Sequence, residues 1–167
     1  MTVEFANRSV RRIVTGHDDS GQAVFRSIDE LVTKKIPSGD ATFATVWSTN
    51  EVPVDLNDET DGGSRNVGLT LNGGSVIRVV DMLPGGESPM HRTKSIDYGI
   101  VLFGEVQLEL DGGVVETCGP GDIIVQRGTI HLWRNSSKTQ SCRIVFVLIE
   151  SDGSYRHHGR PLEEIKP

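Results

Sequence analysis

The sequence has few of the features that mark secreted or membrane-spanning proteins. It contains two cysteines in 167 residues, Cys118 and Cys142, which are too few for a disulfide framework. No stretch approaches 18 consecutive apolar residues, and residues 1–5 show neither a basic start nor the apolar core of a signal peptide. We therefore expect a cytoplasmic protein with free thiols and no membrane partner.

Positive charge is also scarce. The formal net charge is -6, and basic residues do not cluster beyond short pairs such as Arg11-Arg12. Binding of DNA or RNA requires a clustered basic face, so the composition argues against a nucleic-acid partner and favours a small-molecule ligand. With 167 residues, of which 36% are hydrophobic, the chain can bury one sizeable core and has little length for a second.

Short strand-like runs separated by turns dominate the chain from its middle onward. Turn signals such as Asp111-Gly112-Gly113 stand between runs of alternating apolar residues. The predicted strands are 42–48, 75–83, 97–103, 105–110, 114–117, 122–126, 131–135 and 142–149. Many short strands with glycine-rich turns predict an all-β sandwich or barrel.

The less regular segments divide the chain into three regions of a single domain. We expect residues 1–40 to form an amino-terminal arm that packs on the barrel, residues 41–155 to form the barrel, and residues 156–167 to form a tail. Within the barrel region, residues 50–66 have the composition of a long polar loop. This loop is predicted to be a lid or a mobile flap.

Two segments carry motifs that resemble those of a known family, the cupins. Gly-x5-His-x-Thr-x3-Asp-x6-Gly, from Gly85 through His91, Thr93 and Asp97 to Gly104, resembles the first cupin motif. Gly121-Asp122, followed by Gly128, His131 and Asn135, resembles the second. The resemblance implies a small single-domain cupin with a double-stranded β-helix, or jelly-roll barrel, and an amino-terminal arm. It also implies a homodimer, paired through strands and the arm.

The chain departs from the family pattern at Thr93, at Asp97, where the pattern has Glu, and at Gln126. The resemblance implies that a metal would be held by two His and one Glu of the first motif and by the His of the second. These ligand positions correspond here to His91, Thr93, Asp97 and His131. Thr93 is a poor metal ligand, and Gln126 stands where the second motif has its proline.

Strand parity supports a three-residue site without help from the family. Side chains alternate between the two faces of a strand, so His91 and Asp97 can face one interior, together with His131. Two imidazoles and one carboxylate suit Fe(II), with Zn, Mn or Ni as other divalent metals. The alternative is a metal-free polar cluster with coupled titrations, which suits acid and base catalysis. In both versions these three residues are the predicted catalytic site.

Four further residues are predicted to shape the substrate pocket. Thr93 shares the parity of His91, and Trp133 shares that of His131. Tyr98 flanks Asp97, and Arg127 lies near the turn at the mouth, where it can reach an anionic substrate.

Three functions remain open from the sequence. The resemblance favours an enzyme with lyase, decarboxylase or isomerase chemistry on a small organic acid or a polyketide-like metabolite. A non-catalytic module that binds a metabolite is the first alternative, because Thr93 removes one ligand. An Fe(II)-dependent dioxygenase is the second alternative, although its ligand set is incomplete. Fold alone does not separate them.

Overall fold

The regular structure of the protein consists of β-strands. The computed structural model describes residues 9–68, 73–152, 156–162 and 165. All regular elements in these ranges are strands, which confirms the predicted all-β class. In the same ranges, we find no helix with the length and apolar character needed to cross a membrane.

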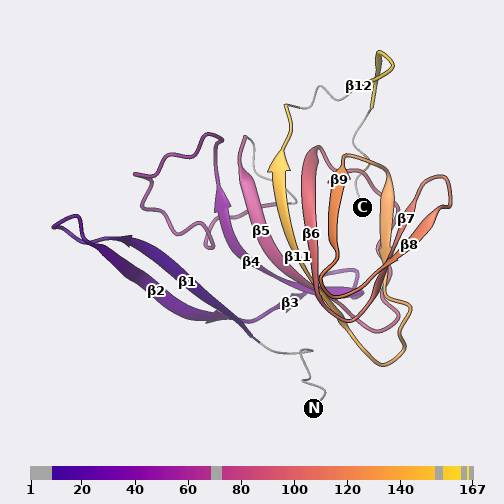
Figure 1. Ribbon diagram of the computed structural model, residues 1–167, viewed down its shortest axis with the longest axis horizontal. Helices are drawn as coiled ribbons and strands as arrows, with labels where there is room; N and C mark the ends of the chain where they lie inside the picture. Colours follow the sequence, from indigo (N-terminus) through magenta and orange to yellow (C-terminus); the bar gives the residue numbers. More distant parts are fainter. Residues whose placement is uncertain (1–8, 69–72, 153–155, 163–164, 166–167) are drawn as a thin grey trace.

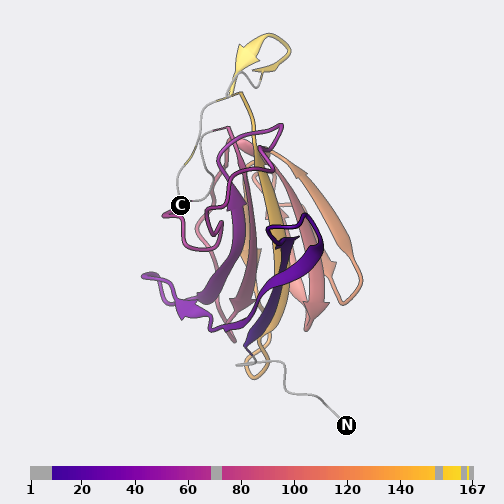
Figure 2. The ribbon, with the colours of Figure 1, turned by 90° about the vertical axis from the view of Figure 1, so that its left-hand side faces the viewer.

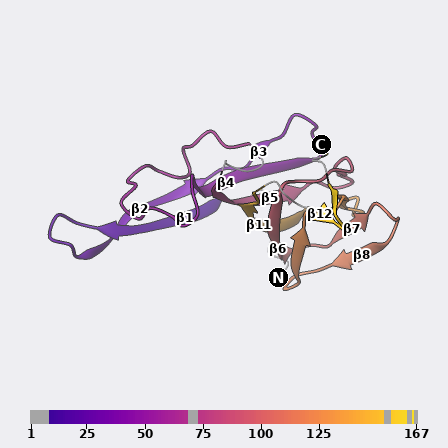
Figure 3. The same cartoon turned by 90° about the horizontal axis from the view of Figure 1, so that it is seen from above.

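Two sheets form the barrel, as the jelly-roll prediction requires (Figures 1 and 3). Six antiparallel strands make the larger sheet, in the order β3 (Lys34–Lys35), β4 (Ala41–Thr49), β5 (Ser75–Met82), β11 (Cys142–Glu150), β6 (Ser95–Phe103) and β9 (Ile123–Arg127). The smaller sheet contains β10 (His131–Arg134), β7 (Val106–Leu110) and β8 (Val115–Cys118). Strands that are distant in sequence, such as β5 and β11, are therefore direct neighbours. The barrel interior lies between the two sheets.

A two-stranded hairpin forms most of the arm and projects from the barrel (Figures 1 and 2). It pairs β1 (Val10–His17) with β2 (Ala23–Leu31). Arg12 fastens it to the rest of the molecule: its guanidinium donates to Asp29 on β2, to Asp61 at 2.9 Å and to the Val46 carbonyl at 3.3 Å. The arm region is not separate throughout, because β3 joins the edge of the large sheet.

The predicted lid loop lies beside this hairpin. Its residues, among them Asp58 and Arg65, line a cleft of about 500 Å³ between the hairpin and the barrel. Glu59 of the loop forms an ion pair with Arg26 of the hairpin. None of residues 50–66 is among the residues that line the barrel cavity. The structure therefore associates the loop with the arm and not with the cavity.

The tail returns to the barrel. Its described residues form a small hairpin of β12 (Arg156–His157) and β13 (Arg160–Pro161). Beyond it, Ile165 pairs with Arg92 through two backbone hydrogen bonds of 2.7 and 3.2 Å. These bonds hold the end of the chain against the segment that carries His91.

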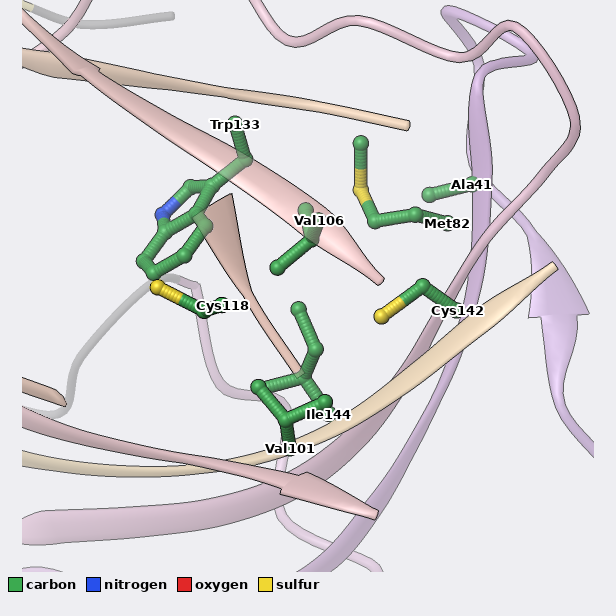
Figure 4. Close-up of a cluster of buried hydrophobic side chains, with 8 residues drawn as sticks. All are labelled: Ala41, Met82, Val101, Val106, Cys118, Trp133, Cys142 and Ile144. Carbon is green, nitrogen blue, oxygen red and sulfur yellow. The ribbon is translucent and has the colours of Figure 1, made fainter. Parts of the chain in front are cut away.

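A cluster of buried apolar side chains fills one part of the barrel interior (Figure 4). It consists of Ala41, Met82, Val101, Val106, Cys118, Trp133, Cys142 and Ile144. Both cysteines are free and buried, as expected. Burial raises the pKa of Cys142 to about 12, so this thiol stays protonated and serves as a small apolar residue. Met82 and Trp133 belong both to the cluster and to the wall of the barrel cavity.

Candidate functional site

A cavity of about 380 Å³ lies inside the barrel, which is within the range of small-molecule sites. Five of the residues predicted from the sequence line it, namely His91, Thr93, Asp97, His131 and Trp133. Apolar side chains, including Phe43, Met82 and Phe146, form much of the remaining wall. The cavity therefore combines a polar group of side chains with an apolar enclosure.

The two histidines are held in matching ways by the two motifs. His91 and His131 exchange both of their backbone hydrogen bonds, each 2.9 Å long, and their ring centroids lie 4.2 Å apart. In each ring Nδ1 is 2.9 Å from the carbonyl oxygen two residues earlier, that of Pro89 or of Thr129. A carbonyl oxygen only accepts, so Nδ1 carries the proton, and Nε2 of the neutral ring keeps its lone pair. Both imidazoles are thereby prepared to accept a proton or to bind an electrophile.

Asp97 is bound by neutral donors from three directions. Its carboxylate accepts hydrogen bonds from the Ser95 hydroxyl, from Thr93 Oγ1 at 3.2 Å and from Gln126 Nε2 at 2.8 Å. Gln126 is the direct neighbour of Asp97 across the β6–β9 pair. Only 3% of the Asp97 surface is exposed. The carboxylate is thus fixed in position without a cation among these three partners.

Burial shifts both His131 and Asp97 toward their uncharged forms. It lowers the pKa of His131, which is 1% exposed, to about 4. Burial also raises the pKa of Asp97, and the hydrogen bonds from Ser95, Thr93 and Gln126 oppose that rise. Loss of hydration disfavours a charge of either sign, which accounts for the opposite directions. Near neutral pH, His131 is consequently an uncharged base.

The structure does not show the three-ligand metal centre expected from the sequence. In the described part of the chain, no three His, Cys, Asp or Glu side chains make a group that could hold a metal ion. The physical reason lies in Asp97, whose carboxylate is engaged by Ser95, Thr93 and Gln126. The residues present therefore do not fit the His91, Asp97 and His131 ligand set expected from the sequence.

Two predicted pocket residues, Tyr98 and Arg127, lie outside the cavity lining. Each follows an inward-facing residue, Asp97 or Gln126, so strand alternation turns its side chain to the outer face of the sheet. Arg127 instead lines a separate groove of about 210 Å³, together with Arg92 and others. The same strand alternation that places Thr93 and Trp133 in the cavity wall turns Tyr98 and Arg127 away from the cavity.

Two cavity residues were missed from the sequence, Arg78 and Gln126. Arg78 lies on the same face of β5 as Val80 and Met82, and all three side chains line the cavity. A charged residue at an inward position of an apolar strand is an available signal. Gln126 stood out only as a replacement for proline, and its contact with Asp97 depends on the register between β6 and β9.

Comparisons with known proteins agree with this architecture. Residues 78–148 match the family described as "Cupin domain". The chain is 46% identical over 151 residues to "Phomopsin biosynthesis cluster protein C'" of Diaporthe leptostromiformis, a match that covers 86% of this chain and 80% of the relative. It is 41% identical to "Cupin-domain-containing oxidoreductase fogC" of Aspergillus ruber, with coverage of 87% and 75%.

A solved structure supports the fold independently of sequence. The cupin domain of Cnp3 from Schizosaccharomyces pombe superimposes with a TM-score of 0.52 at 10% identity, and the alignment covers 86% of this chain and 88% of that one. An identity this low bears on the fold alone. Together with the two motifs, the barrel and the relatives of more than 40% identity, it establishes that the chain belongs to the cupin family.

Proposed function

We propose that the protein is an enzyme that moves protons on a small oxygenated metabolite inside the barrel, with isomerase or lyase chemistry. One observation carries the proposal: His131 is buried and uncharged, and its Nδ1 is committed to the Thr129 carbonyl. Such an imidazole is a general base for a substrate in the cavity. Support also comes from the relatives named for biosynthetic clusters, which are consistent with a small-molecule role.

In the proposed reaction, His131 acts as the base and the carboxyl group of Asp97 acts as the acid. His131 Nε2 takes a proton from carbon beside a substrate carbonyl, and electron density moves onto the carbonyl oxygen. Asp97, whose pKa is raised by burial, is the acid that we propose for transfer of a proton to that oxygen. Return of the proton from His131 to another carbon completes an isomerisation, while its delivery to a β-hydroxyl releases water and completes an elimination. In both cases the proton on the carbonyl oxygen returns to Asp97 as the carbonyl re-forms. His91, in ring contact with His131, helps to position the His131 ring.

A second function, redox chemistry, is favoured by the names of several relatives. Four relatives that are 32–41% identical to the chain are named cupin-domain-containing oxidoreductases. Oxidation of a substrate needs an acceptor such as O₂, and Fe(II) would have to bind through fewer than three of the predicted ligands. The remaining alternative is a protein that binds a metabolite in the cavity and does not convert it.

The decisive experiment follows proton exchange and oxygen uptake together. Wild-type protein is incubated in D₂O with a panel of small β-hydroxy ketones and keto acids, and deuterium incorporation and loss of water are followed by NMR. We expect exchange that falls by about 10²-fold or more in His131→Gln. Trp47→Phe, on the far side of the sheet, is the control and should retain activity. Uptake of O₂ in place of exchange would contradict the proposal and support the redox function.

We also propose that the protein forms a homodimer through its hairpin arm. Ile13, Phe25 and Ile28 are 47%, 70% and 53% exposed, and Ile13 is paired with Ile28 across the hairpin. Such apolar side chains on a projecting hairpin are suited to burial against a second copy. Light scattering should give twice the mass of the chain for wild type. Ile13→Ser with Ile28→Ser should shift the mass toward the monomer, and an unchanged mass would count against this interface.

A further inference from the structure

We propose that Arg78 binds a carboxylate of the ligand, and that the cavity therefore takes a small organic acid with an apolar or aromatic body. The inference deepens the proposed function by naming the substrate class. It starts from the position of Arg78 on β5, where the side chain lines the cavity and is 6% exposed. A guanidinium in the wall of a ligand cavity is a recognition group for an anion.

The cost of burying Arg78 indicates a use for it. Its neighbours at the same parity are Val80 and Met82, so an apolar residue would suit the position. Burial of a charge is expensive unless it is compensated. Burial also lowers the pKa of Arg78, and the carboxylate of Asp97 acts in the opposite direction. A carboxylate brought by the ligand would lower the energy of this charge further.

Two contacts of the Arg78 guanidinium, among others, are with uncharged groups in the cavity wall. Nη2 donates to the Gly68 carbonyl at 2.7 Å, and the centre of the guanidinium lies 5.4 Å from the Phe43 ring. A backbone carbonyl and an aromatic face orient the planar group without neutralising its charge. These contacts help to orient the cationic group of a residue that lines the cavity.

The rest of the cavity defines the body of the ligand. Phe43, Phe146 and Trp133 give it aromatic walls, and the volume of about 380 Å³ suits a molecule of roughly one ring with substituents. The histidine pair and Asp97 line the same cavity as Arg78. A ligand anchored at Arg78 by its carboxylate would therefore present its remaining oxygen-bearing groups to His131 and Asp97.

A structural role for Arg78 is the competing explanation. Its bond to Gly68 fastens the segment before β5 to the barrel, and loss of that bond would disturb the cavity for every ligand equally. A binding role makes a different prediction, because only ligands with a negative charge should lose affinity. The experiment below uses acids and their neutral amides, which have nearly the same shape.

Calorimetric titration with benzoate and 2-hydroxybenzoate, against benzamide and 2-hydroxybenzamide, tests the inference. We expect the wild type to bind the acids at least about tenfold more tightly than the amides. Arg78→Met should reduce that ratio to about one, and Arg78→Lys should leave an intermediate ratio. Arg127→Met removes a cation that faces away from the cavity and should keep the wild-type ratio. Thermal unfolding confirms that each variant is folded; if Arg78→Met is not, Arg78→Gln replaces it.

Three outcomes would overturn the inference. They are a preference for acids that survives in folded Arg78→Met or Arg78→Gln, equal losses for acids and amides, and a wild type that shows no preference or binds neither acid at millimolar concentration. The titration needs no turnover, so it is independent of the proton-transfer proposal. His131→Gln should keep the acid preference. If it does, and wild type shows no proton exchange, the carboxylate site stands while the proposed function fails.

Discussion

Buried charged residues on the two faces of the large sheet have different kinds of partners. On the outer face, Arg143 of β11 binds Asp81 of β5 through two hydrogen bonds of 2.6 and 2.7 Å, and both residues are less than 10% exposed. On the inner face, Arg78 contacts the Gly68 carbonyl and the Phe43 ring, and Asp97 accepts from uncharged groups. The same residue types therefore occur on both faces with different partners.

The difference separates charges that serve the fold from charges that serve a ligand. In the Arg143–Asp81 pair, two charge-assisted hydrogen bonds join the guanidinium to the carboxylate, so each charge is compensated within the fold. Asp97 and Arg78 lie in the cavity wall and are positioned by neutral contacts. We infer that the outer pair stabilises the barrel and that the inner groups give the cavity its chemistry. Each prediction below tests one side of this contrast.

The largest expected effect on stability comes from breaking the outer pair. Asp81→Asn leaves the buried Arg143 guanidinium without its charged partner, which costs about 3–5 kcal/mol of the free energy of unfolding in comparable pairs. Urea denaturation at pH 7 measures the loss. Replacing both residues, with Asp81→Asn and Arg143→Met, should recover part of it, because no unpaired charge remains. A cost below about 1 kcal/mol would mean that the pair is not structural.

The pH dependence of stability tests the inner face through His131. Its pKa is lowered to about 4 in the folded protein, so between pH 6.5 and 4 the unfolded chain binds the extra proton. The wild type should therefore lose about 3 kcal/mol as the pH falls through this window, and no loss from this group is expected above it. His131→Gln should lack this slope. The difference between the two curves isolates His131 from Asp97, whose raised pKa acts in the opposite sense.

How far the sequence predicts this site depends on the kind of information each residue carries. Strand parity placed His91, Thr93, Asp97 and Trp133 correctly, because alternation is a local property of an extended chain. The contact between Asp97 and Gln126 was not predicted, because Gln126 lies on another strand and the register between the two strands cannot be read from motif spacing. The place of residues 50–66 beside the arm likewise depends on contacts between distant segments.

The position of this loop is the second feature that local sequence patterns do not predict. Composition identified residues 50–66 as a loop, but its position is set by ion pairs such as Arg26–Glu59 and Arg12–Asp61. These pairs join positions far apart in the chain, and no local sequence pattern around either residue predicts its partner. Fold class, by contrast, follows from repeated local patterns of strands and turns, and it was predicted in full.

Restoring the missing imidazole should sharpen the role of the inner face. Thr93 is 4% exposed, lines the cavity and occupies the place where the family pattern has its second histidine. Thr93→His would add a third imidazole near His91 and His131. We expect affinity for Zn²⁺ or Ni²⁺ to rise by about tenfold or more, the scale on which changes around a metal alter its binding. Thr93→Val is the matched control and should show no gain in calorimetry.

The smallest expected effect on stability comes from Asp97→Asn on the inner face, although the same change of residue type at Asp81 is the most costly on the outer face. Asp97→Asn removes a buried carboxyl group whose pKa is raised by burial, so it also removes the cost of ionising that group in the interior. The amide retains an oxygen that can accept from Gln126 or Thr93. We expect the free energy of unfolding to change by less than about 1 kcal/mol.

Activity should respond to Asp97→Asn in the opposite way from stability. The variant cannot donate a proton to a developing oxyanion, so proton exchange should fall by about 10²-fold while the urea midpoint stays near that of wild type. Asp81→Asn should lower the midpoint and leave the rate per folded molecule unchanged. If Asp97→Asn instead destabilised the protein as much as Asp81→Asn, both carboxylates would be structural. The contrast between the two faces would then rest on Arg78 alone.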